Sequence, residues 1–175
     1  MIVVLAAIPL VTLASTSTPP NMDNWVGTWV LNVQKSKYGD GKPPVDPTII
    51  RQVLKIRVAN STLDLYVRTE LANGTDVADE THLLDLTGKP HVTEFDGFKP
   101  VTETFKQLDP NTIEITVKAR PTESEEENWE LTIRVKLTLS ADRKTIRETK
   151  EYHVSDEDAN PAEGTVLVFD KQPSN

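Results

Sequence analysis

Cysteine is absent from this 175-residue chain. The fold therefore contains no disulfide bond, and neither thiol catalysis nor a cysteine-based metal site is possible. With 37% hydrophobic and 26% charged residues, the chain has enough apolar material for a single core. A domain of this composition must be held together by that core alone.

Positive charge is also scarce. The formal net charge is −8 and the sequence pI is about 4.9. No stripe of Lys and Arg is present that would neutralise the phosphates of a nucleic acid, which argues against a nucleic-acid partner, and we expect none. An anionic membrane surface is disfavoured for the same reason.

Motifs that bind cofactors or metals are missing as well. There is no Gly-x-Ser-x-Gly, no phosphate loop and no dinucleotide fingerprint. The histidines His82, His91 and His153 have no metal-ligand spacing, although a fold could bring His82 and His153 together. The acidic segment 120–128 is typical of a solvated loop. The sequence therefore predicts no cofactor and no metal site, and leaves open whether the protein is an enzyme.

Long hydrophobic runs are absent apart from the first. Ile2 to Ala14 is apolar over 13 residues, which as a helix covers about 20 Å and falls short of the ~30 Å bilayer core. A cleaved signal peptide is expected, with Thr12-Leu13-Ala14 near the cleavage point, although no basic residues precede the run. We expect residues 1–20 to be this leader and residues 21–175 to form one secreted domain. An uncleaved membrane anchor and a misassigned start are the alternatives.

Two glycosylation triplets are present, beginning at Asn60 and at Asn73. Both lie in predicted hairpin turns, where a glycan is accessible. Because turns favour Asn and Gly anyway, turn chemistry alone explains them equally well.

Alternation of apolar and polar residues dominates the rest of the chain, and no long amphipathic helix is predicted. The pattern indicates nine or ten strands joined mostly by short turns. The runs are Trp25–Asn32, Thr48–Val58, Thr62–Leu71, Val77–Leu86, His91–Phe95, Val101–Leu108, Thr112–Ala119, Trp129–Leu139, Lys144–Val154 and Gly164–Lys171.

The first run contains Gly27-Thr28-Trp29, which resembles the opening strand of the calycins, the superfamily of lipocalins and fatty-acid-binding proteins. The segment Gly27 to Tyr38 also resembles the start of a family of small secreted lipocalin-like domains. Matching segments follow at Asp109–Thr112, Ser140–Thr145 and Val168–Gln172. The resemblance implies an all-β, up-and-down antiparallel β-barrel of about 8–10 strands. A β-sandwich is the alternative fold.

Polar residues on inward strand faces are the candidates for a site, because a barrel of this size can hold one small ligand. In Lys144–Val154, Ile146 and Val154 favour the even-numbered face as inward. Glu148, Lys150 and Tyr152 would then line the interior, with Glu103 and His82 as further candidates. The alternatives are an edge strand exposed on both faces, or a simple pair of Glu148 with Lys150.

The ligand-binding motif of fatty-acid-binding proteins is not matched. Their last strand carries an Arg-x-Tyr that holds the ligand carboxylate, and this position resembles Leu167-x-Phe169 here. Lys150 or Arg147 would have to supply a charge instead. An apolar interior with few polar anchors is suited to a small hydrophobic or mixed-polarity molecule.

Three functions are compatible with the sequence. The first is a secreted lipocalin-like protein that binds such a ligand in the barrel. The second is a cofactor-free isomerase or cyclase of a natural-product pathway, in which Glu148, Lys150 or Tyr152 acts as acid or base. The third is an extracellular structural domain without a ligand. The oligomeric state is not predicted.

Overall fold

The computed structural model describes residues 20–37, 49–71, 77–95, 98–121, 129–155 and 165–173. The expected leader up to Pro19, the glycosylation triplet at Asn73 and most of the acidic segment, residues 122–128, lie outside these ranges. Asn60, in contrast, is described and is exposed in a turn.

The described residues form ten β-strands and contain no helix, which confirms the all-β prediction. They accordingly include no helical segment of the length and hydropathy needed to cross a bilayer. The strands are β1 (Gly27–Leu31), β2 (Ile49–Ala59), β3 (Thr62–Leu71), β4 (Val77–Asp85), β5 (His91–Phe95), β6 (Phe98–Asp109), β7 (Thr112–Pro121), β8 (Leu131–Leu139), β9 (Thr145–Val154) and β10 (Val166–Lys171).

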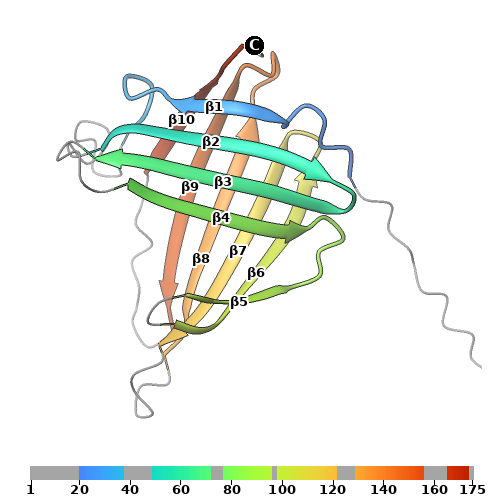
Figure 1. Ribbon diagram of the computed structural model, residues 1–175, viewed down its shortest axis with the longest axis vertical. Helices are drawn as coiled ribbons and strands as arrows, with labels where there is room; N and C mark the ends of the chain where they lie inside the picture. The colour runs from blue at the N-terminus through green and yellow to red at the C-terminus, as the bar shows by residue number, and fades with distance from the viewer. Residues whose placement is uncertain are drawn as a thin grey trace, which may run out of the picture.

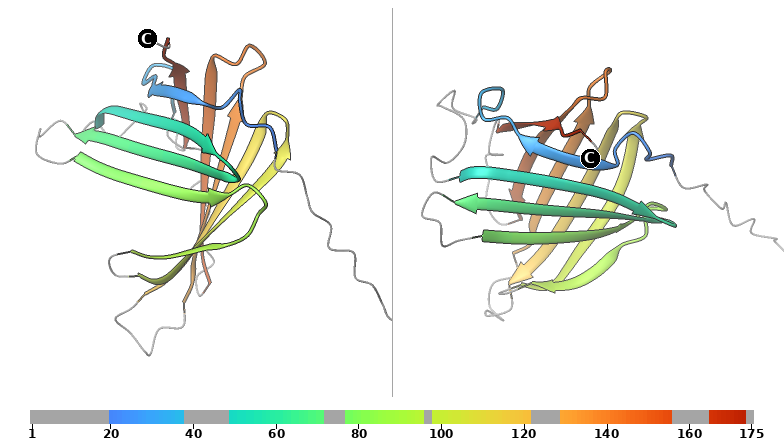
Figure 2. Two further views of the ribbon diagram at one scale, coloured as in Figure 1. Left: turned by 45° about the vertical axis from the view of Figure 1, so that its right-hand side comes forward. Right: turned by 45° about the horizontal axis from the view of Figure 1, so that its top comes forward.

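All ten strands belong to one antiparallel sheet in the order β4-β3-β2-β1-β10-β9-β8-β7-β6-β5. Pairing of β1 with β10 joins the two ends of the chain, so the sheet curls into a nearly closed up-and-down barrel (Figure 1). Strands β1 to β4 cross β6 to β10 at a steep angle (Figure 2). The β-sandwich alternative is wrong, because no second sheet forms in this part of the chain. Edges β4 and β5 flank the seam that the ladder leaves unpaired.

Residue alternation sets the register of each hairpin. In β2 and β3 the inward pairs are Leu54 with Val67 and Ile56 with Leu65, and the charged neighbours face outward. A shift of one residue would turn every one of these side chains to the wrong face. Asn60 closes this hairpin at φ 55°, a left-handed conformation that Asn tolerates better than most residues.

Strand β6 begins at Phe98, three residues before the predicted start at Val101. The predicted turn therefore extends too far at its C-terminal end. Pro100 explains the difference: the β6–β7 register is irregular between Phe98 and Val101, and a proline, which has no N–H to donate, is accommodated in strands at such irregularities.

One end of the barrel is closed by the residues before β1. Met22 and Trp25 are buried, and the Trp25 N–H donates to the Met22 carbonyl at 2.9 Å. Trp29 in β1 is also fully buried, and its Nε1 donates to the Trp25 carbonyl at 3.0 Å. The two indoles therefore anchor the N-terminal turn inside the barrel, and we call this the closed end.

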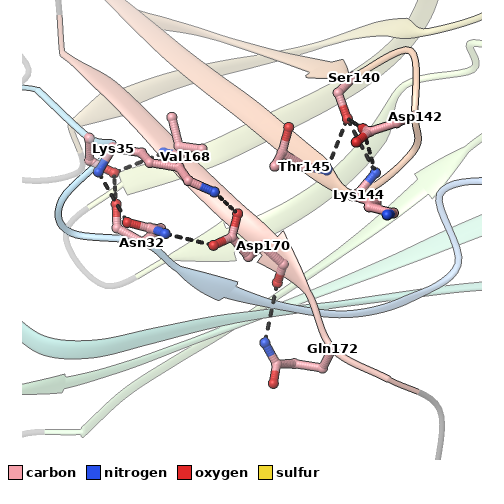
Figure 3. A network of polar contacts seen from close by, with 10 residues as sticks. Asn32, Lys35, Ser140, Asp142, Lys144, Thr145, Val168, Asp170 and Gln172 are labelled. Atoms are coloured by element: carbon pink, nitrogen blue, oxygen red, sulfur yellow. Dashed lines mark hydrogen bonds and ion pairs between the residues drawn. The ribbon is translucent and has the colours of Figure 1, made fainter.

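The turn after β1 is fastened to β10. Asn32 Nδ2 donates to Asp170 Oδ2 at 2.6 Å, and Lys35 Nζ lies 2.8 Å from Asp170 Oδ1 (Figure 3). Buried Ser36 accepts a hydrogen bond from the Val168 N–H at 2.9 Å and donates to the Asn32 carbonyl at 2.8 Å. These contacts give the Asn-x-x-Lys-Ser segment a structural role: it joins the chain's first and last strands.

Candidate ligand-binding site

The barrel interior is packed at the closed end and accessible towards the other. Along β3, Leu63 and Leu65 are buried, whereas the next inward residue, Val67, is half-buried. Other inward apolar side chains far from the closed end behave like Val67, namely Val117, Val135 and Leu167. The pair Val101 and Ala119 is an exception and is buried. We call the part of the barrel that contains these half-buried side chains the open half, because solvent reaches its inward apolar surface.

Charged side chains lie between these two halves. His82 and Glu80 are opposite Leu65 and Val67, which places them on the inward face of β4. On β9, Glu148 and Lys150 are opposite the inward residues Leu137 and Val135. Glu103 faces inward from β6, where it is only 6% exposed. These five residues, Glu80, His82, Glu103, Glu148 and Lys150, form what we call the interior cluster.

His82 and Glu103 connect the two sides of the seam. His82 Nδ1 lies 2.6 Å from Glu103 Oε1, although β4 and β6 are not paired through their backbones. The hydrogen bond to Glu103, followed by the contact with Glu80, outweighs the effect of burial and raises the pKa of His82 from 6.5 to about 9. At neutral pH His82 is therefore an imidazolium.

Glu80 completes the contacts of this imidazolium. Its Oε2 lies 3.7 Å from His82 Nε2. The interaction with His82 lowers the pKa of Glu80, against a smaller opposing effect of burial. Both ring nitrogens of His82 consequently face carboxylates, and neither is free to act as a metal ligand.

Glu148 and Lys150 form the second part of the interior cluster. Lys150 Nζ lies 3.2 Å from Glu148 Oε1, and Glu148 is only 6% exposed. Burial alone would lower the pKa of Lys150, but the negative charges around it, with Glu148 first, produce a net increase. The pairing that the sequence left as an alternative is thus present, and it occurs on an inward face.

The remaining candidates lie elsewhere. Tyr152 continues the inward face of β9, opposite Ile133, and is 40% exposed near the strand's end. Arg147 and His153 are exposed and alternate with these inward residues. His153 is therefore not brought to His82. The described ranges contain no group of three His, Asp or Glu side chains that could hold a metal ion.

Several inward polar residues were not among the predicted site residues, and two of them are Glu80 and Gln52; Thr69 and His91, opposite Gln52 and Glu103, are others. Glu80 shares the face of His82, so the same alternation could have identified it. Gln52 interrupts the apolar face of β2 and is only 9% exposed; its Nε2 donates to Thr69 Oγ1 at 3.2 Å, and its Oε1 has no partner. Gln52 could have been identified from the sequence because it is a polar residue on an otherwise apolar strand face.

A groove of about 950 Å³ lies mainly across the outer faces of β7, β8 and β9 and also reaches Tyr152 near the end of β9. Its charges balance, and Lys118 Nζ lies 2.7 Å from Glu130 Oε1. The lining residues are Glu114, Thr116, Lys118, Glu130, Thr132, Arg134, Lys136, Thr149, Glu151, Tyr152, His153 and Ser155. This polar surface does not provide the apolar contacts that a hydrophobic ligand needs, so the open half of the interior is the better candidate.

Comparison of the chain with protein-family models and with curated protein sequences gave no match. The geometry itself defines the class: an all-β, nearly closed up-and-down barrel that is compatible with a calycin-like fold.

Proposed function

We propose that the protein binds a small hydrophobic or mixed-polarity molecule in the open half of its barrel. The observation that carries this proposal is the half-buried state of inward apolar side chains such as Val67, Val135 and Leu167. Side chains in a filled core are buried, as Leu63, Ile113 and Phe169 are at the closed end. Covering the accessible apolar surface stabilises a complex by about 25 cal/mol per Å².

We further propose that the chain is a lipocalin-like member of the calycins and that it is secreted after removal of residues 1–20. The Gly27-x-Trp29 strand at the closed barrel end and the up-and-down order support the family. The apolar run Ile2 to Ala14 supports secretion. The mass of the mature protein tests removal of the leader: it should equal that of residues 21–175.

A cofactor-free isomerase or cyclase is the second candidate function. It is favoured by the hydrogen-bonded pair of His82 and Glu103, since a charged imidazolium on the inward face of the barrel can act as a general acid. This function predicts that a bound molecule leaves chemically altered, and that His82→Gln abolishes the change without abolishing binding.

Native mass spectrometry of gently purified protein, compared with the same sample after denaturation, tests binding. We expect a small-molecule adduct that is retained in the native spectrum and lost on denaturation. Adding a neutral apolar fluorophore to protein stripped of its adduct should then give saturable fluorescence. A bare native mass together with no saturable fluorophore binding would contradict the proposal.

A further inference from the structure

We propose that the ligand carries a cationic head group, a protonated amine, and that Glu148 receives it. The inference rests on the proposed function, because it concerns the chemistry of a molecule held in the open half of the barrel. It is carried by the charge balance of the interior cluster and by the hydrogen-bonding state of its buried oxygen atoms.

Carboxylates outnumber cations in the interior cluster. Glu80, Glu103 and Glu148 face two cations, His82 and Lys150. His82 is engaged by two of the carboxylates, and Lys150 lies beside the third. The cluster therefore carries one more negative charge than positive charges, and the side chain of Glu80 is exposed to solvent at 53%. A ligand cation would supply the missing charge.

The oxygen atoms point to the same chemistry. Gln52 Oε1 has no hydrogen-bond partner, and Glu148 Oε1 has Lys150 Nζ, 3.2 Å away, as its neighbour. Both residues are at least nine-tenths buried and both lie on inward faces. Among the described residues, Trp25 Nε1 at the closed end is the one buried inward donor that lacks a hydrogen-bond partner. An unmet buried acceptor favours a ligand that donates hydrogen bonds.

An anionic head group finds no comparable partner. Lys150 is next to Glu148, and Arg147 is exposed on the opposite face of β9. The last strand contributes Leu167 and Phe169 to the interior, neither of which carries a charge. A carboxylate entering the open half would meet a surplus of like charge, which disfavours its binding. The structure therefore argues against capture of a fatty acid.

Three twelve-carbon probes that differ only in their head group test the inference: dodecylamine, dodecanol and dodecanoate. The affinity of each probe is measured by its displacement of a neutral apolar fluorophore from the intact protein at pH 7 and physiological ionic strength. Each probe is kept below its own critical micelle concentration. We expect dodecylamine to bind about tenfold more tightly than dodecanol, since a hydrogen bond to a charged group contributes about 1.5–3 kcal/mol. Dodecanoate should bind more weakly than dodecanol.

Glu148→Gln should abolish the preference for dodecylamine over dodecanol when the two affinities are compared within the variant. The matched control is Glu151→Gln, which makes the same charge change on the outer face of β9. It should leave all affinities unchanged, which separates the local interaction from the attraction of an acidic protein for any cation. Glu80→Gln, at an exposed side chain, provides a second variant should Glu148→Gln fail to fold, and should weaken amine binding severalfold.

Lys150→Met acts in the opposite direction, because it removes a cation and keeps an apolar stem. We expect tighter binding of dodecylamine and weaker binding of dodecanoate. Equal affinities for the amine and the alcohol, or an amine preference that Glu151→Gln reduces as much as Glu148→Gln does, would overturn the cationic head group. Those outcomes would not contradict ligand binding in the open half of the barrel. A complete lack of fluorophore binding would refute the proposed function itself.

Discussion

Lys171 lies over the indole ring of Trp29, with its Nζ 4.8 Å from the ring centroid. The same ammonium donates a hydrogen bond to the Asn24 carbonyl at 3.3 Å. Gly27 sits beneath this contact at φ +143°, and a Cβ at this position would be 3.2 Å from Lys171 Cε. The first and last strands of the barrel are thus locked together at the closed end by a glycine, an indole and an ammonium group.

Gly27→Ala should therefore lower the free energy of unfolding by about 1–3 kcal/mol, because a side chain is strained at this φ. Urea unfolding followed by tryptophan fluorescence measures the change. Gly88→Ala is the control, because Gly88 also has a positive φ. Its loss of unfolding free energy measures the cost of backbone strain alone. A Gly27→Ala protein as stable as the wild type would contradict the lock.

The turn between β8 and β9 contains a second strained residue, Arg143, at φ +59°. Arg143→Gly should raise the free energy of unfolding by about 0.5–1 kcal/mol, since glycine adopts this conformation without a Cβ clash and its greater unfolded-state entropy offsets only part of the gain. Arg143→Val should lower it. Urea denaturation of the three proteins gives the order, and a glycine variant less stable than the arginine protein would refute it.

The His82 contact makes stability depend on pH. The folded-state pKa of about 9 lies above the ordinary value of 6.5, so the stabilisation is fully present below pH 6.5. It is lost as pH rises through about 9. One pKa unit corresponds to 1.36 kcal/mol, so the loss between pH 6.5 and the region above 9 is on the order of 3 kcal/mol.

Urea denaturation of the wild type and of His82→Gln between pH 6 and pH 10 tests this dependence. The variant should be less stable at pH 6 and close to the wild type at pH 10, because the glutamine does not titrate against Glu80 and Glu103. His153→Gln, at an exposed position, should retain the wild-type slope. Parallel curves for His82→Gln and the wild type would show that the seam contact contributes no charge interaction.

Local alternation was sufficient to predict nine or ten strands, of which the structure has ten, and the inward face of β9; the pairing of Glu148 with Lys150 was one of the alternatives. It was not sufficient to pair His82 with Glu103. That contact joins two strands with no backbone pairing, and its formation depends on which edges of the sheet meet at the seam. The start of β6 was missed because Pro100, a turn residue in most contexts, lies at an irregularity inside a strand.

Filling the open half of the barrel tests the central claim most directly. Val135 is half-buried on the inward face of β8, and its neighbour Lys136 is exposed on the outer face. Titration of a neutral apolar fluorophore should show that Val135→Trp weakens binding by at least about tenfold, since the indole occupies the space the ligand needs. Lys136→Trp should bind like the wild type, and near-ultraviolet circular dichroism should show both variants folded. Unchanged fluorophore affinity in a folded Val135→Trp protein would contradict a ligand site inside the barrel.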